Sequence, residues 1–149
     1  MTNPKNPQIR PLKGIRILSL ALNLPGPSAL MRCQQMGARC AKLEPPAGDA
    51  MQTYSPAAYS ALHQGIRITT ADLKTDAGQK AMHRELAKAD VLLTSFRPSA
   101  LQKLGMAWAD LHAQFPALNM VSIVGSPGAG AEIPGHDLTY LAANGLVTD

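Results

Sequence analysis

Four segments of this 149-residue sequence place polar or turn-forming residues directly after a predicted strand. They are residues 25–27, residues 44–46, residues 95–97 and the loop that leads to His136 and Asp137. Ligands of open α/β sheets bind beyond the carboxyl ends of the strands, so these segments are the candidate binding positions. Among them, His136 has a side chain whose pKa range suits proton transfer near neutral pH. The alternative is that His136 and Asp137 only begin a helix, with Asp137 near the positive end of its dipole.

Several other chemistries lack their sequence signatures. No G-x-G-x-x-G follows the first predicted strand and no Walker A sequence is present, which disfavours dinucleotide and P-loop binding. No serine lies in a nucleophile-elbow pattern, so a serine hydrolase is not supported. Cys33 and Cys40 are the only cysteines and form no C-x-x-C pair. No histidine has metal-ligand spacing, so we expect two free thiols and no metal site.

The composition is ordinary for a globular domain and narrows the class of partner. Hydrophobic residues make up 46% of the chain, and the net charge is +4, from 14 basic and 10 acidic residues. The basic residues are scattered with few aromatics between them, which disfavours nucleic acid and favours a polyanionic small molecule. Residues 1–13 are polar and proline-rich, unlike a signal peptide, and residues 15–24 are too short to span a bilayer. We therefore expect a cytoplasmic protein with no membrane association.

The first elements predict a β-α-β unit. Residues 15–22 form a nearly continuous apolar run, typical of a buried parallel strand. Gly26-Pro27-Ser28 ends this run and can open a helix at about residues 29–36, with Ser28 as a possible cap. Gly37 suits the end of that helix, and residues 39–44 form the second strand.

The rest of the chain continues the alternation of strands and helices. Residues 47–61 resemble a loop because of their Gly-Asp and Ser-Pro pairs. The pattern then predicts strands at 66–70, 90–94 and 120–124, helices at 76–89 and 108–114, a helical turn capped by Ser99, a loop at 125–135 and a helix from 136 onward. This order predicts the α/β class, with a Rossmann-like, open, mostly parallel sheet and flanking helices. We expect residues 1–13 to be a tail and residues 14–149 to form the domain.

Blocks along nearly the whole chain resemble one family. Residues 11–18, PLKGIRIL, are followed by PGP at 25–27; residues 36–46 read MGARCAKLEPP and are followed by Gly48-Asp49. Further blocks are GIR and DLKT in residues 65–75, ADVLL and FRP in residues 89–98, and PGHDLTY at 134–140. In this order and spacing the blocks resemble the N-terminal, CoA-binding part of family III CoA-transferases, a superfamily that also contains α-methylacyl-CoA racemases.

The resemblance implies a Rossmann-like CoA-binding domain and, for the full-length protein, an interlocked homodimer that acts on an acyl-CoA and a small carboxylic acid. The implied cations, Lys74, Arg97 and Lys103, can pair with CoA phosphates through charge-assisted hydrogen bonds. The alternative for each cation, and the one that the residue favours when it is taken singly, is an exposed, solvated base. Asp72 could equally lie at a helix start. The complete set of implied CoA contacts is Glu44, Pro45, Ala71, Asp72, Leu73, Lys74, Ser95, Phe96, Arg97 and Lys103.

The resemblance also implies a mechanism and alternatives to it. In the transferases an enzyme carboxylate attacks the acyl-CoA thioester, and the resemblance places that Asp beyond residue 149, so that Asp149 is not expected to be the nucleophile. In the racemases a His and an Asp exchange the α-proton. The resemblance places that His in the segment of His136 and Asp137, which are the catalytic candidates present, and places the Asp beyond residue 149. A third alternative, from another class, is a truncated CoA-binding fragment without catalytic activity.

Overall fold

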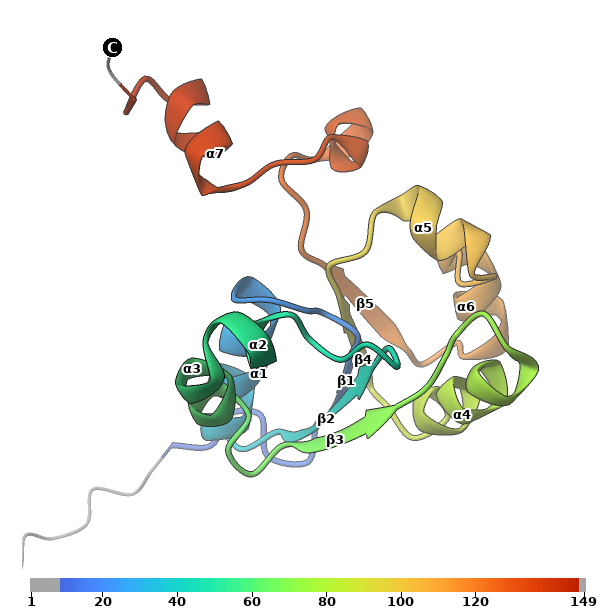
Figure 1. The fold of residues 1–149 in the computed structure, drawn as a ribbon. Coiled ribbons are helices and arrows are strands. Elements are labelled where there is room, and N and C mark those ends of the chain that lie inside the picture. Colours follow the sequence, from blue (N-terminus) through green and yellow to red (C-terminus); the bar gives the residue numbers. More distant parts are fainter. Residues whose placement is uncertain (1–8, 148–149) are drawn as a thin grey trace, which may run out of the picture.

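The computed structural model of the protein describes residues 9–147, in which one parallel sheet lies between two layers of helices (Figure 1). Residues 1–8 of the predicted tail and Asp149 lie outside the described residues. The strands follow the order β3-β2-β1-β4-β5, and every neighbouring pair is parallel. The predicted α/β class and parallel sheet are therefore confirmed. The strand bounds are β1 Arg16–Ser19, β2 Arg39–Glu44, β3 Arg67–Thr70, β4 Val91–Thr94 and β5 Asn119–Ser122.

Seven α-helices and one 3-10 turn connect or follow the strands of the described chain. They are α1 Pro25–Gln35, α2 Met51–Tyr54, α3 Pro56–Leu62, α4 Asp76–Leu86, α5 Pro98–Lys103, α6 Trp108–Gln114, η1 Gly128–Glu132 and α7 Asp137–Ala143. Within residues 9–147, no helix combines the length and the apolar character needed to cross a membrane.

Each face of the sheet has its own apolar core because side chains alternate along a strand. On β1, Ile17 belongs to the core on the α1 side, whereas Leu18 belongs to the core that contains Met82 of α4. Figure 1 shows the same division, with α1 to α3 on one side of the sheet and α4 to α6 on the other. The larger core comprises Leu18, Leu20, Leu43, Met82, Leu86, Leu92, Leu101, Met106, Leu111 and Leu118, and the smaller Ile17, Ala21, Leu30, Ala38, Ile66 and Leu93.

The parallel register brings the carboxyl ends of all the strands to one edge, called here the carboxyl edge. β1 pairs with β2 on one side and with β4 on the other, so the strand order reverses at β1. In open α/β sheets this switch point is where ligands bind. The segments that follow β1, β2, β3 and β4 therefore share the edge at which a ligand is expected.

Two details of the predicted helices are wrong. The first helix begins at Pro25, earlier than expected, because proline suits the first helical position; Ser28 lies inside the helix and makes no cap hydrogen bond. Residues 47–61, predicted to be a loop, contain α2 and α3. The Ser55-Pro56 pair that suggested a break instead joins these two helices, with Pro56 in the first turn of α3.

The other predicted cap is also wrong. Arg97, not Ser99, is the residue at the N-terminal cap position of α5, and it makes no side-chain cap hydrogen bond. Ser99 lies in the first turn, where its backbone N–H and its hydroxyl each donate to a Glu132 carboxylate oxygen at 2.7 Å. At α4 the cap belongs to Thr75, whose hydroxyl accepts from the Gly78 N–H at 3.1 Å.

Gly78 is required by the turn that leads from β3 into α4. A Cβ atom placed on this glycine would lie 1.8 Å from the Asp72 carbonyl oxygen and 3.1 Å from the Leu73 nitrogen. Both neighbours are backbone atoms and cannot move as a flexible side chain would. The absence of a side chain therefore lets α4 pack against the segment from Ala71 to Lys74.

We expect Gly78→Ala to destabilise the protein by roughly 1–3 kcal/mol, the usual cost of overpacking. This reverses the ordinary gain of about 1 kcal/mol for the same change inside a helix. Urea denaturation measures the difference, with Lys80→Ala at an exposed position of the same helix as the control. An unchanged or higher free energy of unfolding for Gly78→Ala would contradict the close approach.

Candidate functional site

The carboxyl edge collects most of the residues predicted to contact a ligand. Glu44 ends β2 and Pro45 follows it; Ala71 to Lys74 follow β3; Ser95 to Arg97 follow β4. Ala71 is tied to the end of β2, because its N–H donates to the Glu44 carbonyl at 2.9 Å. Lys103 lies in the last turn of α5, the helix that begins directly after Arg97. These predicted residues thus come from the ends of β2, β3 and β4 and from one adjoining helix.

Several of these side chains already have partners inside the protein. Glu44 is buried and accepts a hydrogen bond from the Tyr59 hydroxyl at 2.9 Å. The Ser95 hydroxyl accepts from the Leu22 N–H at 3.3 Å, and Asp72 Oδ1 accepts from the Lys74 N–H at 3.0 Å. Ala71, Leu73 and Phe96 pack against the larger core. At these positions the backbone is better placed than the side chain to meet a ligand.

The three predicted cations remain available at the surface. Lys74, Arg97 and Lys103 are exposed, and among residues 9–147 none of the three forms an ion pair. Arg97 and Lys103 act together with the Ser99 hydrogen bonds to lower the pKa of Glu132, the Ser99 bonds being the larger cause. Three exposed cations beside strand ends can bind phosphate or carboxylate groups.

A small pocket lies next to Arg97, between α5, α6 and the ends of β4 and β5. Its volume is about 290 Å³, and its lining includes the Phe96 and Trp108 rings together with Met120, Ser122 and Glu132. Aromatic and thioether side chains beside a few polar groups suit a flat, partly polar ligand group.

A buried ionic cluster that the sequence did not reveal lies between β2 and the α2–α3 segment; we call Lys42, Glu44, Asp49, Tyr59 and His63 the Lys42 cluster. Lys42 Nζ lies 2.6 Å from Asp49 Oδ2, 2.9 Å from Glu44 Oε1 and 3.0 Å from His63 Nε2. Lys42 has no exposed surface. Among the described residues, every buried side-chain nitrogen and oxygen atom has a hydrogen-bond partner. A buried charge is tolerated only with such pairing.

The pKa values of the Lys42 cluster reflect two effects, the burial of its side chains and their hydrogen bonds with neighbouring groups. Burial alone would raise the pKa of Asp49, but hydrogen bonds from Lys42, Met51 and Asn23 outweigh it, and the pKa lies below its usual value. Burial lowers the pKa of His63, more than its bond with the Tyr59 carbonyl raises it. Burial, and then the bond to Glu44, raise the pKa of the Tyr59 hydroxyl. His63 is thus neutral at pH 7 and accepts from Lys42 through Nε2.

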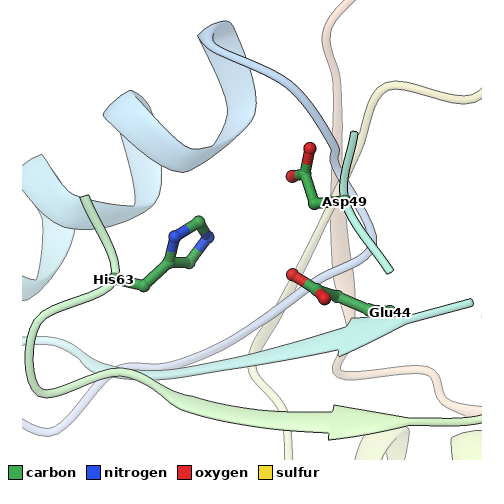
Figure 2. Close-up of side chains that lie close together, drawn as sticks. All are labelled: Glu44, Asp49 and His63. Carbon is green, nitrogen blue, oxygen red and sulfur yellow. The ribbon is translucent and has the colours of Figure 1, made fainter. Parts of the chain in front are cut away.

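Glu44, Asp49 and His63 have the arrangement of a metal site, because each offers a ligand atom within 4.8 Å of the other two (Figure 2). The three side chains converge from the end of β2, the loop after it and the end of α3. The Lys42 ammonium contacts all three and supplies the positive charge that a cation would bring. These residues therefore form a structural ion cluster around a lysine.

The Lys42 cluster reaches the carboxyl edge through Asp49. Both Asp49 carboxylate oxygens accept from the Asn23 N–H at 3.1 Å, and Oδ1 also accepts from the Met51 N–H at 3.0 Å. Asn23 lies in the loop between β1 and α1 and has a φ of 61°. It is the one residue other than glycine with a positive φ in residues 9–147. The cluster thus fixes the backbone of this loop.

The predicted catalytic residues, His136 and Asp137, do not lie at the carboxyl edge. His136 is the N-terminal cap residue of α7 and Asp137 its first residue; both side chains are exposed. The His136 N–H donates to the Thr139 hydroxyl at 3.4 Å. Figure 1 shows α7 apart from the sheet, and none of its residues is buried. The described part of the chain therefore does not bring His136 and Asp137 together with the strand ends of the carboxyl edge.

A family model described as "CoA-transferase family III" matches residues 12–148. Among curated proteins, the chain is 32% identical to a cinnamoyl-CoA:phenyllactate CoA-transferase from Clostridium sporogenes, over 91% of this chain and 36% of that protein. It is 32% identical to a succinate–glutarate CoA-transferase from Agrobacterium fabrum, over 93% of this chain and 38% of that protein. The chain therefore spans well under half the length of these relatives.

Several solved structures are also similar to this chain. A CaiB/BaiF family protein from Brucella suis superposes with a TM-score of 0.81 at 32% identity, over 93% of this chain and 40% of that one. A protein from Mycobacterium tuberculosis described as hypothetical superposes with a TM-score of 0.84 at 33% identity, over 93% of this chain and 41% of that one. The similarity in fold extends over nearly all of the present chain.

The lowered pKa of His63 predicts that stability falls as the pH drops below about 6.5, the ordinary histidine value. Below that pH the unfolded chain binds a proton that folded His63 does not, so acid favours unfolding. We expect the free energy of unfolding to decrease between pH 7 and pH 5.5 and His63→Gln to remove most of this slope. His112→Gln, at an exposed histidine of α6, is the matched control. A slope that persists in His63→Gln would contradict the assignment.

Proposed function

The chain belongs to CoA-transferase family III, and on that premise we propose that the full-length protein moves CoA from an acyl-CoA to a small carboxylic acid. The chain covers less than half of its curated relatives, so this activity is proposed for the whole protein. The proposed role of residues 14–147 is to bind the CoA part of the substrate. The single observation that carries the proposal is the family match over residues 12–148.

The charges of the carboxyl edge support CoA as the ligand. CoA carries several phosphate groups, and Lys74, Arg97 and Lys103 are exposed cations beside the ends of β3 and β4. The backbone of Ala71 to Lys74 and of Ser95 to Arg97 is proposed to contribute the remaining contacts. The pocket that Phe96 and Trp108 line suits a flat ring such as adenine. Glu44 and Pro45 stay predicted contacts, but the buried carboxylate of Glu44 supports only a role through its backbone.

The proposed reaction uses a carboxylate nucleophile beyond residue 149. This carboxylate attacks the thioester carbonyl, which gives an acyl-enzyme anhydride and releases the CoA thiolate. The thiolate then attacks the anhydride at the enzyme acyl carbon, which gives an enzyme-CoA thioester and releases the first acid. Attack by the acceptor acid and return of CoA complete the transfer. Residues 14–147 would hold the CoA part while its sulfur atom is bonded in turn to the first acyl group, the enzyme carboxyl group and the acceptor acyl group.

The exposed position of His136 supports a second candidate, a 2-methylacyl-CoA racemase. A histidine beside a helix start, in contact with solvent, is free to carry a proton to or from a substrate that the rest of the protein brings to it. Asp137 would then be its neighbour in the first turn of α7. A third candidate, a non-catalytic fragment, predicts CoA binding without transfer.

Association of the full-length protein into a homodimer also stays a proposal. The segment after β5 exposes several large apolar side chains, Ile133, Leu138, Leu146 and Val147. Where exposed apolar side chains join into a patch, they commonly mark a contact with another chain or another part of the same chain, and we propose these four as candidates for such a contact. The expected location in the cytoplasm is likewise a prediction.

The double variant Lys74→Ala/Arg97→Ala should weaken binding of free CoA by at least about 10-fold, because it removes two candidate partners of the phosphates. Isothermal titration calorimetry on the full-length protein measures this affinity. The matched control is Lys13→Ala/Arg39→Ala, which removes one lysine and one arginine, both exposed, near the amino ends of β1 and β2. Equal losses of CoA affinity in the two double variants would indicate a general effect of net charge and would contradict the proposed contacts.

Proton exchange separates the racemase from the transferase. If the racemase proposal is correct, the full-length protein incorporates deuterium at the α-carbon of a 2-methylacyl-CoA in deuterated buffer, and His136→Ala slows this by about 100-fold or more. Mass spectrometry of the recovered thioester measures the exchange, with His112→Ala as the control. No exchange in the wild type would rule out the racemase and leave the transferase and the non-catalytic fragment, which a transfer assay separates.

A further inference from the structure

The loop between β1 and α1 occupies the switch point of the sheet. β1 lies between β2 and β4, and the loop begins at its carboxyl end. The Leu20 N–H donates to the Leu93 carbonyl at 2.8 Å, and the Leu22 N–H donates to the Ser95 hydroxyl at 3.3 Å. These bonds tie the start of the loop to the end of β4. The tip that follows, Asn23 to Pro25, is exposed.

The chemistry of the tip differs from that of its neighbours on the carboxyl edge. Residues 20–28 contain no charged side chain, and Leu24 is 55% exposed. The exposed cations lie in the segments that lead from β3 into α4 and from β4 into α5, which cover the opposite face of the sheet from α1 (Figure 1). An extended ligand with phosphates at one end and an uncharged thioester group at the other would match this division. The tip fits the uncharged end, an assignment that rests on the function proposed above.

The tip is held in a conformation that needs support. Asn23 has a φ of 61°, in the left-handed region, which asparagine tolerates better than most residues but at some cost. The Asn23 N–H is directed at both carboxylate oxygens of Asp49, each 3.1 Å away. Asp49 is itself buried, 1% exposed, and fixed by Lys42 and by the Met51 N–H. The buried Asp49 carboxylate thus holds the backbone N–H of Asn23 in the exposed tip.

We propose that Asp49 is a positioning residue for the reaction: through its bonds to the Asn23 N–H, it orients the exposed tip of residues 23–25 toward the acyl-thioester end of the substrate. Lys42 acts through Asp49, because its ammonium keeps the carboxylate ionised and in place. Neither side chain touches the substrate, since both are buried beneath the loop. Substitution of Asp49 should therefore impair turnover more than CoA binding.

Asp49→Asn in the full-length protein tests this, with Asp90→Asn as a matched control. Asp90 also accepts from a backbone N–H, that of Arg16, and from a cationic side chain, but it lies at the amino end of β4. Hydrogen-deuterium exchange requires no substrate, and we expect residues 20–26 to lose protection in Asp49→Asn alone. Unchanged protection of this segment in a folded Asp49→Asn protein would overturn the proposal.

Kinetics with succinyl-CoA and glutarate as probes supply the second readout. We expect Asp49→Asn to lower kcat by at least about 10-fold and to change the Kd of free CoA by less than about 3-fold, because the CoA phosphates lie away from the tip. Asp90→Asn should alter neither. Equal losses in kcat and in CoA affinity would overturn the positioning role. A wild-type protein that neither binds CoA nor transfers it would overturn the proposed function instead, and the exchange experiment would still test Asp49.

A second pair of variants covers the case in which Asp49→Asn does not fold. Asn23→Ala and Asn23→Gly both remove the asparagine side chain and keep the N–H, yet only glycine adopts a positive φ without strain. We expect kcat to be several-fold lower in Asn23→Ala than in Asn23→Gly. Equal values of kcat in the two variants would overturn the proposal, since the backbone conformation of the tip would then have no effect.

Discussion

The contact between the Lys42 ammonium and the Asp49 carboxylate, 2.6 Å long and fully buried, is the interaction on which the rest of this structure depends. Removing two charges from water costs several kcal/mol for each ion, so the pair persists only because further groups satisfy it. Glu44 and His63 complete the surroundings of Lys42, and the Asn23 and Met51 N–H groups complete those of Asp49. The same bonds join β2, α2, α3 and the loop after β1 into one unit.

Much of the fold could be predicted from sequence because its strands are short, apolar and clearly bounded. The strand at residues 39–44 was predicted with the bounds of β2, and the helix at 108–114 with those of α6. The α2–α3 segment was missed because its helices are very short and a Ser-Pro pair, usually a break, joins them. Ser28 and Ser99 were assigned as caps from residue type alone, whereas the helix starts depend on Pro25 and Pro98.

The candidate site, like the fold, could be predicted from sequence only in part. The family blocks indicated the segments after β2, β3 and β4, because each carries its own local pattern. Lys42, Glu44 and Asp49 lie in one of the family blocks, but the block does not indicate that they form a buried ionic cluster, since its histidine lies 21 residues from Lys42. One signal was present: Lys42 and Glu44 are two residues apart and thus share a face of a strand predicted to lie within the sheet. Two opposite charges on the inner face of a strand require buried partners, although the sequence does not identify them.

All the charged members of the Lys42 cluster, and the loop residue that it holds, are encoded between Asn23 and His63. By contrast, the pairing of β1 with β4 joins residues that lie about 74 positions apart, as the Arg16–Asp90 bond illustrates. A chain that is being synthesised releases its N-terminal residues first. All the partners of the ionic cluster therefore leave the ribosome before β4, the strand that completes the pairing of β1.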